Sequence, residues 1–127
     1  MQDFERKVFD GYLVEIVNIT RATAKEAKEF KQILDEDILY GHHNLIIDLS
    51  KCEFMDSTFI GVMVVTYKKL RGRGGIMKLI KPGLFANSLL NYTGTIEIFE
   101  TYETLEEAVQ SFRKQQDPFL KKIYSLL

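Results

Sequence analysis

Residues 45–49, Leu-Ile-Ile-Asp-Leu, restrict the fold more than any other part of the chain. A nearly continuous apolar run of this length is typical of a central strand in a parallel sheet that is covered on both faces. Strand and helix patterns alternate from residue 44 onward, which predicts βαβ units and an α/β layer architecture. We therefore expect a single-layer, mostly parallel sheet of four to five strands with about four helices.

Two elements are expected before this strand. Val8–Phe9 and Tyr12–Ile19 flank Asp10-Gly11, a dipeptide that favours the tight turn of an antiparallel hairpin. Apolar residues at three- and four-residue steps predict an amphipathic helix from Thr23 to Tyr40, ended by Gly41. After residue 50 we expect a helix over 58–71, a strand over 76–80, a short helix over 84–91, a strand over 96–99 and a final helix around 105–112.

The length of 127 residues fits one domain with a single core. We assign residues 1–117 to this domain and 118–127 to an amphipathic C-terminal tail, because Pro118 is expected to end the last helix. Apolar tail residues recur at helical spacing, at Phe119, Leu120, Ile123, Tyr124 and Leu127. The tail could pack on the domain, remain unstructured or mediate a homodimer.

Composition and charge exclude several classes of protein. The 17 basic and 18 acidic residues give a net charge of -1, which provides no electrostatic reason to bind nucleic acid or an anionic membrane. One cysteine, Cys52, allows no internal disulfide and fits a reducing compartment, where it is expected to pack. The charged start does not resemble a signal peptide, and the longest apolar run, 59–65, is too short to span a bilayer. We expect a cytoplasmic protein.

Asp56, Ser57 and Thr58 form the candidate site, because they lie where the chain passes from a strand into a helix. Free backbone N–H groups and the positive end of the helix dipole meet at such a junction, so a carboxylate, a hydroxyl or a phosphate is stabilised there. Many such triplets only cap a helix. The sequence leaves both interpretations open.

The helix after this triplet is apolar around much of its circumference. Phe59, Val62, Met63 and Leu70 form one face, and further apolar residues widen it, at Ile60, Val64 and Tyr67. Packing on a sheet needs only one apolar stripe. The surplus predicts either burial between neighbouring helices or a surface that meets a partner.

Metal and catalytic chemistry have little support. His42, His43 and Cys52 lack the number and spacing of zinc ligands, and the glycines at 72–75 follow a helix, whereas a phosphate-binding loop follows a strand. No Gly-x-Ser-x-Gly elbow surrounds Ser57. Asp48 is expected to satisfy backbone N–H groups at the end of its strand. We therefore expect no metal, no cofactor and no enzymatic activity.

Three segments together resemble the central signature of the STAS domain: 45–50 (Leu-Ile-Ile-Asp-Leu-Ser), 54–58 (Phe-Met-Asp-Ser-Thr) and 60–62 (Ile-Gly-Val). Stand-alone bacterial STAS proteins are anti-sigma factor antagonists. The resemblance implies that Ser57 is a phosphoacceptor, with Thr58 as second candidate. It also implies a partner, an anti-sigma factor with a histidine-kinase-like ATP-binding fold, and a phosphatase that would reverse the modification. The partner contacts expected from it are Asp56, Ser57, Thr58, Phe59, Ile60 and Val64.

The chain departs from the family pattern at two places. Phe59 stands where a glycine is usual, and its ring could crowd the acceptor or contact a partner. Residues 20–23, Thr-Arg-Ala-Thr, stand where the family often has Gly-Glu-x-Asp. These departures favour an alternative, a STAS domain that is not phosphorylated and binds a nucleotide or another small ligand at the same edge. A regulatory subunit of a transport complex is a further alternative.

Overall fold

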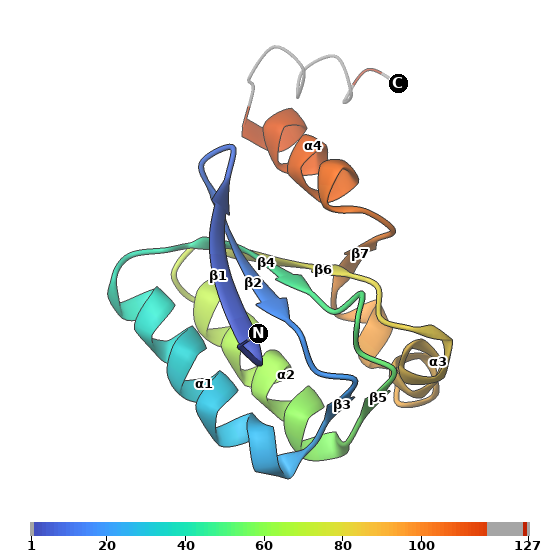
Figure 1. Cartoon of the computed structure of the whole chain (residues 1–127). Helices are drawn as coiled ribbons and strands as arrows, with labels where there is room; N and C mark the ends of the chain where they lie inside the picture. The colour runs from blue at the N-terminus through green and yellow to red at the C-terminus, as the bar shows by residue number, and fades with distance from the viewer. Residues whose placement is uncertain (1, 117–125, 127) are drawn as a thin grey trace.

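The computed structural model describes residues 2–116 and 126, and its main feature is a mixed five-stranded sheet (Figure 1). The strand order is β1-β2-β4-β6-β7, and all pairs except β1 with β2 are parallel. These strands are β1 (Phe4–Phe9), β2 (Tyr12–Val17), β4 (Asn44–Asp48), β6 (Ile76–Ile80) and β7 (Glu100–Tyr102). A second, two-stranded parallel sheet is formed by β3 (Arg21–Ala22) and β5 (Phe54–Met55).

Four helices complete the described part of the chain: α1 (Ala24–Leu39), α2 (Ser57–Arg71), α3 (Leu84–Tyr92) and α4 (Leu105–Gln116). Helices α1 and α2 lie side by side on one face of the main sheet, and α4 lies on the other (Figure 1). Helix α3 packs beside β5 and is followed by a short 3-10 helix, η1 (Thr95–Glu97). The predicted architecture is confirmed.

Strand β4 separates two apolar clusters because successive side chains of a strand point to opposite faces. Leu45 and Ile47 belong to the larger cluster, under α1 and α2, whereas Ile46 belongs to the smaller cluster, under α4. All three are fully buried. The continuous apolar run in the sequence is thus explained by a strand that is covered on both sides.

The N-terminal hairpin forms where Asp10-Gly11 predicts it. Phe9 pairs with Tyr12, so the connection has two residues, and both have positive φ angles of 55° and 84°. This is the conformation that a primed turn requires. The predicted helix from Thr23 is also confirmed, with Thr23 as its N-cap and Gly41 in the left-handed conformation after its end.

The strand predicted over 96–99 is wrong. The left-handed Gly94 (φ 74°) leads instead into η1, and the edge strand follows three residues later, where Tyr102 pairs with Ile80. Of the apolar residues that suggested a strand, Phe99 is buried against Tyr67 and helps to close the core, whereas Ile98 is 40% exposed. Pro118 and the predicted amphipathic tail lie outside the described residues.

Candidate functional site

The carboxylate of Asp56 joins the beginnings of α1 and α2. Its Oδ1 atom accepts a hydrogen bond of 2.9 Å from the backbone N–H of Phe59, which makes Asp56 the N-cap of α2. Its Oδ2 atom accepts a hydrogen bond of 2.7 Å from the N–H of Ala24, the first residue of α1. One side chain therefore satisfies unpaired donors of two helices and fixes the start of α2 against its neighbour.

Ser57 and Thr58 are the first two residues of α2, and both are exposed. No hydrogen bond holds either hydroxyl within the described part of the chain. A hydroxyl at this position is open to a modifying enzyme, and a phosphate on it would meet the positive end of the helix dipole. The side chain of Ser57 can therefore gain charge without disturbing the packing beneath it.

Phe59 and Ile60 point into the core, which corrects the expectation that their side chains contact a partner. Phe59 is 0% exposed, and its ring stacks on Phe30 of α1 with a centroid distance of 4.7 Å. Ile60 is also buried. Because the Phe59 ring is turned inward, it leaves Ser57 uncovered and contributes to the contact between α1 and α2.

Burial accounts for most of the surplus apolar residues of α2. Met63 and Leu70 are buried, and Val64 and Tyr67 are partly buried against the same cluster. Val65 is the exception, with 48% of its surface exposed. The outer side of α2 is therefore only partly apolar.

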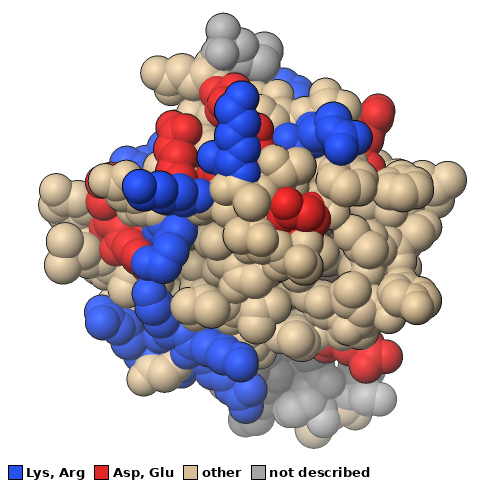
Figure 2. All heavy atoms as spheres, turned by 90° about the horizontal axis from the view of Figure 1, so that it is seen from below, with Lys and Arg blue, Asp and Glu red and all other residues tan. Residues whose placement is uncertain are grey.

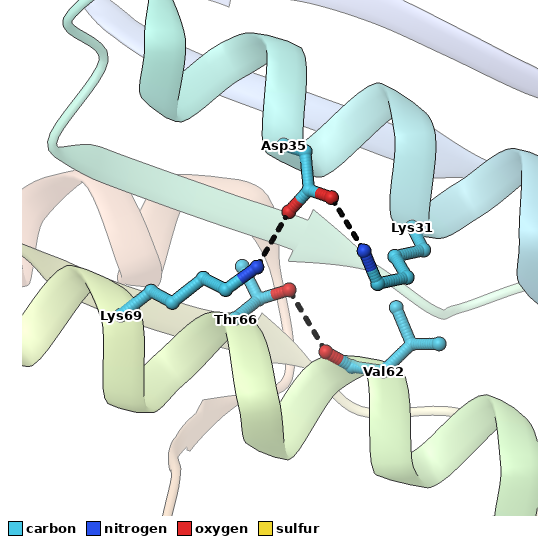
Figure 3. Close-up of polar contacts among 5 residues, drawn as sticks. All are labelled: Lys31, Asp35, Val62, Thr66 and Lys69. Atoms are coloured by element: carbon cyan, nitrogen blue, oxygen red, sulfur yellow. Dashed lines mark hydrogen bonds and ion pairs between the residues drawn. The ribbon is translucent and has the colours of Figure 1, made fainter.

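A shallow groove of about 260 Å³ runs between the outer sides of α1 and α2. Figure 3 shows Asp35 of α1 paired with Lys31 on the same helix and, across the groove, with Lys69 of α2, at Oδ–Nζ distances of 2.7 Å and 3.0 Å. The hydrogen bond from Lys31 is the main cause that lowers the pKa of Asp35. The lining residues are Lys31, Asp35, Thr58, Gly61, Val62, Val65, Thr66 and Lys69. The groove reaches the candidate site at Thr58.

The small β3–β5 sheet brings Arg21 beside the segment that leads to Ser57. The guanidinium of Arg21 lies 4.3 Å from the centre of the Phe54 ring, and that ring stacks on Phe85 of α3 at 6.0 Å. We did not predict this row of side chains from the sequence. One feature of the sequence does point to an unusual surface around Phe85. No Asp, Glu, Lys or Arg occurs between Lys81 and Glu97, in a chain with 28% charged residues.

The remaining candidates for chemistry have structural roles. Cys52 is buried, its Sγ lies 3.2 Å from the carbonyl oxygen of Phe54, and burial raises the pKa of its thiol. Asp48 accepts a hydrogen bond of 3.0 Å from the N–H of Ser50, as expected. Among residues 2–116, no three His, Cys, Asp or Glu side chains are grouped to hold a metal ion. No described helix is both long enough and apolar enough to cross a membrane.

Comparison with known proteins agrees with this geometry. The family model described as the STAS domain matches residues 16–108, which include the whole candidate site. The chain therefore belongs to the STAS domain family.

Similar proteins, three of which follow, are described as anti-sigma factor antagonists. A candidate anti-sigma factor antagonist from Thermotoga neapolitana is 30% identical over 108 residues, covering 84% of this chain and 95% of the relative. The crystal structure of a candidate anti-sigma factor antagonist from Thermotoga maritima is 28% identical, with a TM-score of 0.77 and coverage of 87% and 94%. An anti-sigma factor antagonist from Mycobacterium paratuberculosis is 25% identical, with a TM-score of 0.78 and coverage of 87% and 92%.

Proposed function

We propose that this protein is an anti-sigma factor antagonist whose binding to an anti-sigma factor is switched by phosphorylation of Ser57. The observation that carries the proposal is the exposed, unbonded hydroxyl of Ser57 at the start of α2, held in place by Asp56. Asp56, Thr58 and Val64 are the other proposed contacts. The protein would act in the cytoplasm, as a binding partner without catalytic activity of its own.

The physical basis of the switch is a change in charge at a surface that must lose water on binding. Phosphorylation adds about 1.5 to 2 negative charges. Burying that group without a matching cation costs several kcal/mol, and each 1.4 kcal/mol reduces affinity about tenfold. In the free protein the same phosphate lies at a helix N-terminus, where it is tolerated. The modification would therefore prevent docking and leave the fold intact.

The partner is proposed to be an anti-sigma factor with a histidine-kinase-like ATP-binding fold, which would also phosphorylate Ser57, and a phosphatase would reverse the reaction. The test is calorimetric titration against each anti-sigma factor of the source genome, purified separately. We expect Ser57→Ala to bind like wild type and Ser57→Asp to bind at least about a hundredfold more weakly. Equal affinity of both variants and wild type would refute the switch.

Phosphopeptide mass spectrometry after incubation with the anti-sigma factor and ATP identifies the acceptor. Ser57→Ala should abolish the modification and Thr58→Ala should retain it. The reverse result would assign the acceptor role to Thr58. Modification of neither residue would leave a binding protein without this form of control and contradict the proposed regulation.

A second candidate function, binding of a small ligand, is favoured by the groove between α1 and α2. Its walls are mainly aliphatic at Val62 and Val65, and Lys31 and Lys69 provide cationic groups at its rim. A nucleotide or another anion with an apolar part fits this chemistry. Calorimetry with guanine and adenine nucleotides tests it, and the absence of both heat and a shift in melting temperature would exclude nucleotides.

A further inference from the structure

Helix α3 exposes an apolar surface beside β5, the short strand that precedes the candidate site. Leu84, Phe85 and Tyr92 are 86%, 63% and 89% exposed, respectively. Exposed aromatic and aliphatic side chains on one short helix are unusual for a surface that only meets water, and contiguous apolar patches mark interaction sites. We call Arg21, Phe54, Leu84, Phe85 and Tyr92 the α3 patch.

The whole stretch between Lys81 and Glu97 lacks charged residues. The right-hand part of Figure 2, on the side where Figure 1 places α3, is correspondingly a broad area with few charged atoms. Protein interfaces have cores that are depleted of charge and enriched in aromatic residues and arginine. The composition of the α3 patch matches such a core.

Strand β5 connects the α3 patch to Ser57 along the chain. Phe54 lies in β5, which ends at Met55, and Asp56 and Ser57 follow at once. The first turn of α3 is held against the loop before β5, where Gly83 donates a 2.8 Å hydrogen bond to the carbonyl of Cys52. A protein that covers Ser57 from this side would therefore also meet Phe54 and Phe85.

Arg21 indicates the charge of the occupant. Its guanidinium is exposed and stacked on Phe54, and no acidic side chain within residues 2–116 pairs with it. A cation held over an aromatic ring has little freedom to lose when a carboxylate approaches, so it is well suited to bind one at an interface. The complementary surface has an apolar centre and an acidic residue at its border.

We propose that the α3 patch is a second part of the docking surface for the anti-sigma factor, which meets it with apolar side chains and a carboxylate directed at Arg21. The proposal rests on the proposed function, because Ser57 defines the interface that the patch extends. Contacts with the α3 patch would provide affinity for the anti-sigma factor, and phosphorylation of Ser57 would control whether the complex forms.

The test compares matched variants in titrations against the anti-sigma factor that wild type binds. Leu84→Ser and Phe85→Ala should each weaken binding about tenfold or more, as truncation of central apolar contacts does. Leu39→Ser is the control, because Leu39 is 79% exposed at the far end of α1 and should change affinity less than about twofold. Arg21→Glu should weaken binding, whereas Arg71→Glu, at the C-terminal end of α2, should not.

Circular dichroism melts of each variant verify that the fold is retained. If the patch variants bind like wild type while Ser57→Asp loses affinity, the proposed function stands and the α3 patch is refuted. If the patch variants instead abolish a dimer seen by light scattering and leave anti-sigma binding unchanged, a second copy of the chain occupies the patch and the proposal is wrong. If wild type binds no anti-sigma factor, both proposals fail.

Discussion

The Oδ2 atom of Asp56 accepts a hydrogen bond of 2.7 Å from the N–H of Ala24, thirty-two residues earlier in the chain. The same carboxylate caps α2 through Phe59. The position of Ser57 is therefore set by a contact between two helices as well as by its own helix.

Removing this carboxylate should loosen both helix starts. We expect Asp56→Ala to lower the free energy of unfolding by about 2 kcal/mol, since an N-cap contributes about 1 kcal/mol and the second hydrogen bond a similar amount. Asp56→Asn should cost less, because its amide retains one acceptor oxygen. Urea denaturation measures both. Asp35→Ala, which breaks two ion pairs on the surface, with Lys31 and with Lys69, is the control and should cost less than about 1 kcal/mol. Equal stability of Asp56→Ala and wild type would contradict the double cap.

The inward position of Phe59 can be tested against an exposed phenylalanine. Phe59→Ala should destabilise the protein by about 3 to 5 kcal/mol, because it removes the ring that stacks on Phe30 in the core. Phe85→Ala should change stability by only about 0.5 kcal/mol, because most of that ring faces solvent. Chemical denaturation of the two variants decides between core and surface. Similar values for both would mean that Phe59 is not packed as described.

Stability should fall with rising pH because of Glu15. Its carboxyl group is buried beside Asp37, with Arg6 3.1 Å from its Oε2 atom. Burial, and then the hydrogen bond with Asp37, raise its pKa to about 8 from an ordinary value of 4.5. The folded state therefore holds the proton more tightly than the unfolded state, and this stabilisation is complete below pH 4.5 and is lost as pH rises through about 8.

Comparison with an uncharged side chain isolates this effect. Between pH 5 and 8, the unfolding free energy of wild type should decrease relative to that of Glu15→Gln, whose amide does not titrate. Glu29→Gln, on the exposed side of α1, should follow wild type. Parallel curves for wild type and Glu15→Gln would show that Glu15 does not hold the proton in the folded state.

Two glycines should respond to alanine in opposite directions. A Cβ atom at Gly75 would lie 2.5 Å from the backbone oxygen of His43, so Gly75→Ala should cost about 1 to 3 kcal/mol. A Cβ atom at Gly61, within α2, meets nothing within 4 Å, and alanine there should stabilise the helix by about 0.5 to 1 kcal/mol. Thermal denaturation gives the sign of each change. Loss of stability in Gly61→Ala would mean that the groove is closed at this point.

The parts of the fold that the sequence predicts depend on local patterns. The apolar run at 45–49 indicates a central strand because burial on both faces leaves no alternation, and Asp10-Gly11 indicates its turn because few dipeptides adopt two positive φ angles. The prediction of a strand over 96–99 is wrong because it also depends on a short local pattern of apolar residues. Apolar residues also occur in a short helical turn that closes a core, and four residues are too few to distinguish the two periods.

The parts that the sequence does not predict depend on contacts between distant segments. Arg21 and Phe54 become neighbours only through the pairing of two-residue strands, which have no readable pattern of their own. The inward direction of Phe59 depends on Phe30, which lies in a different helix. Ser57 and Asp56 could be placed at a helix start because capping is local, whereas the contact from Asp56 to Ala24 could not be foreseen.

The position of strand β4 affects which amino-acid substitutions the protein can accept. It divides the interior into two compartments, one that includes Leu45 and Ile47 and one that includes Ile46. The cluster beneath α4 shares no buried side chain with the cluster beneath the Ser57 helix. The α4 side can therefore diversify with little effect on the other compartment, and a lineage could build a new binding face there while the edge around Ser57 stays the same.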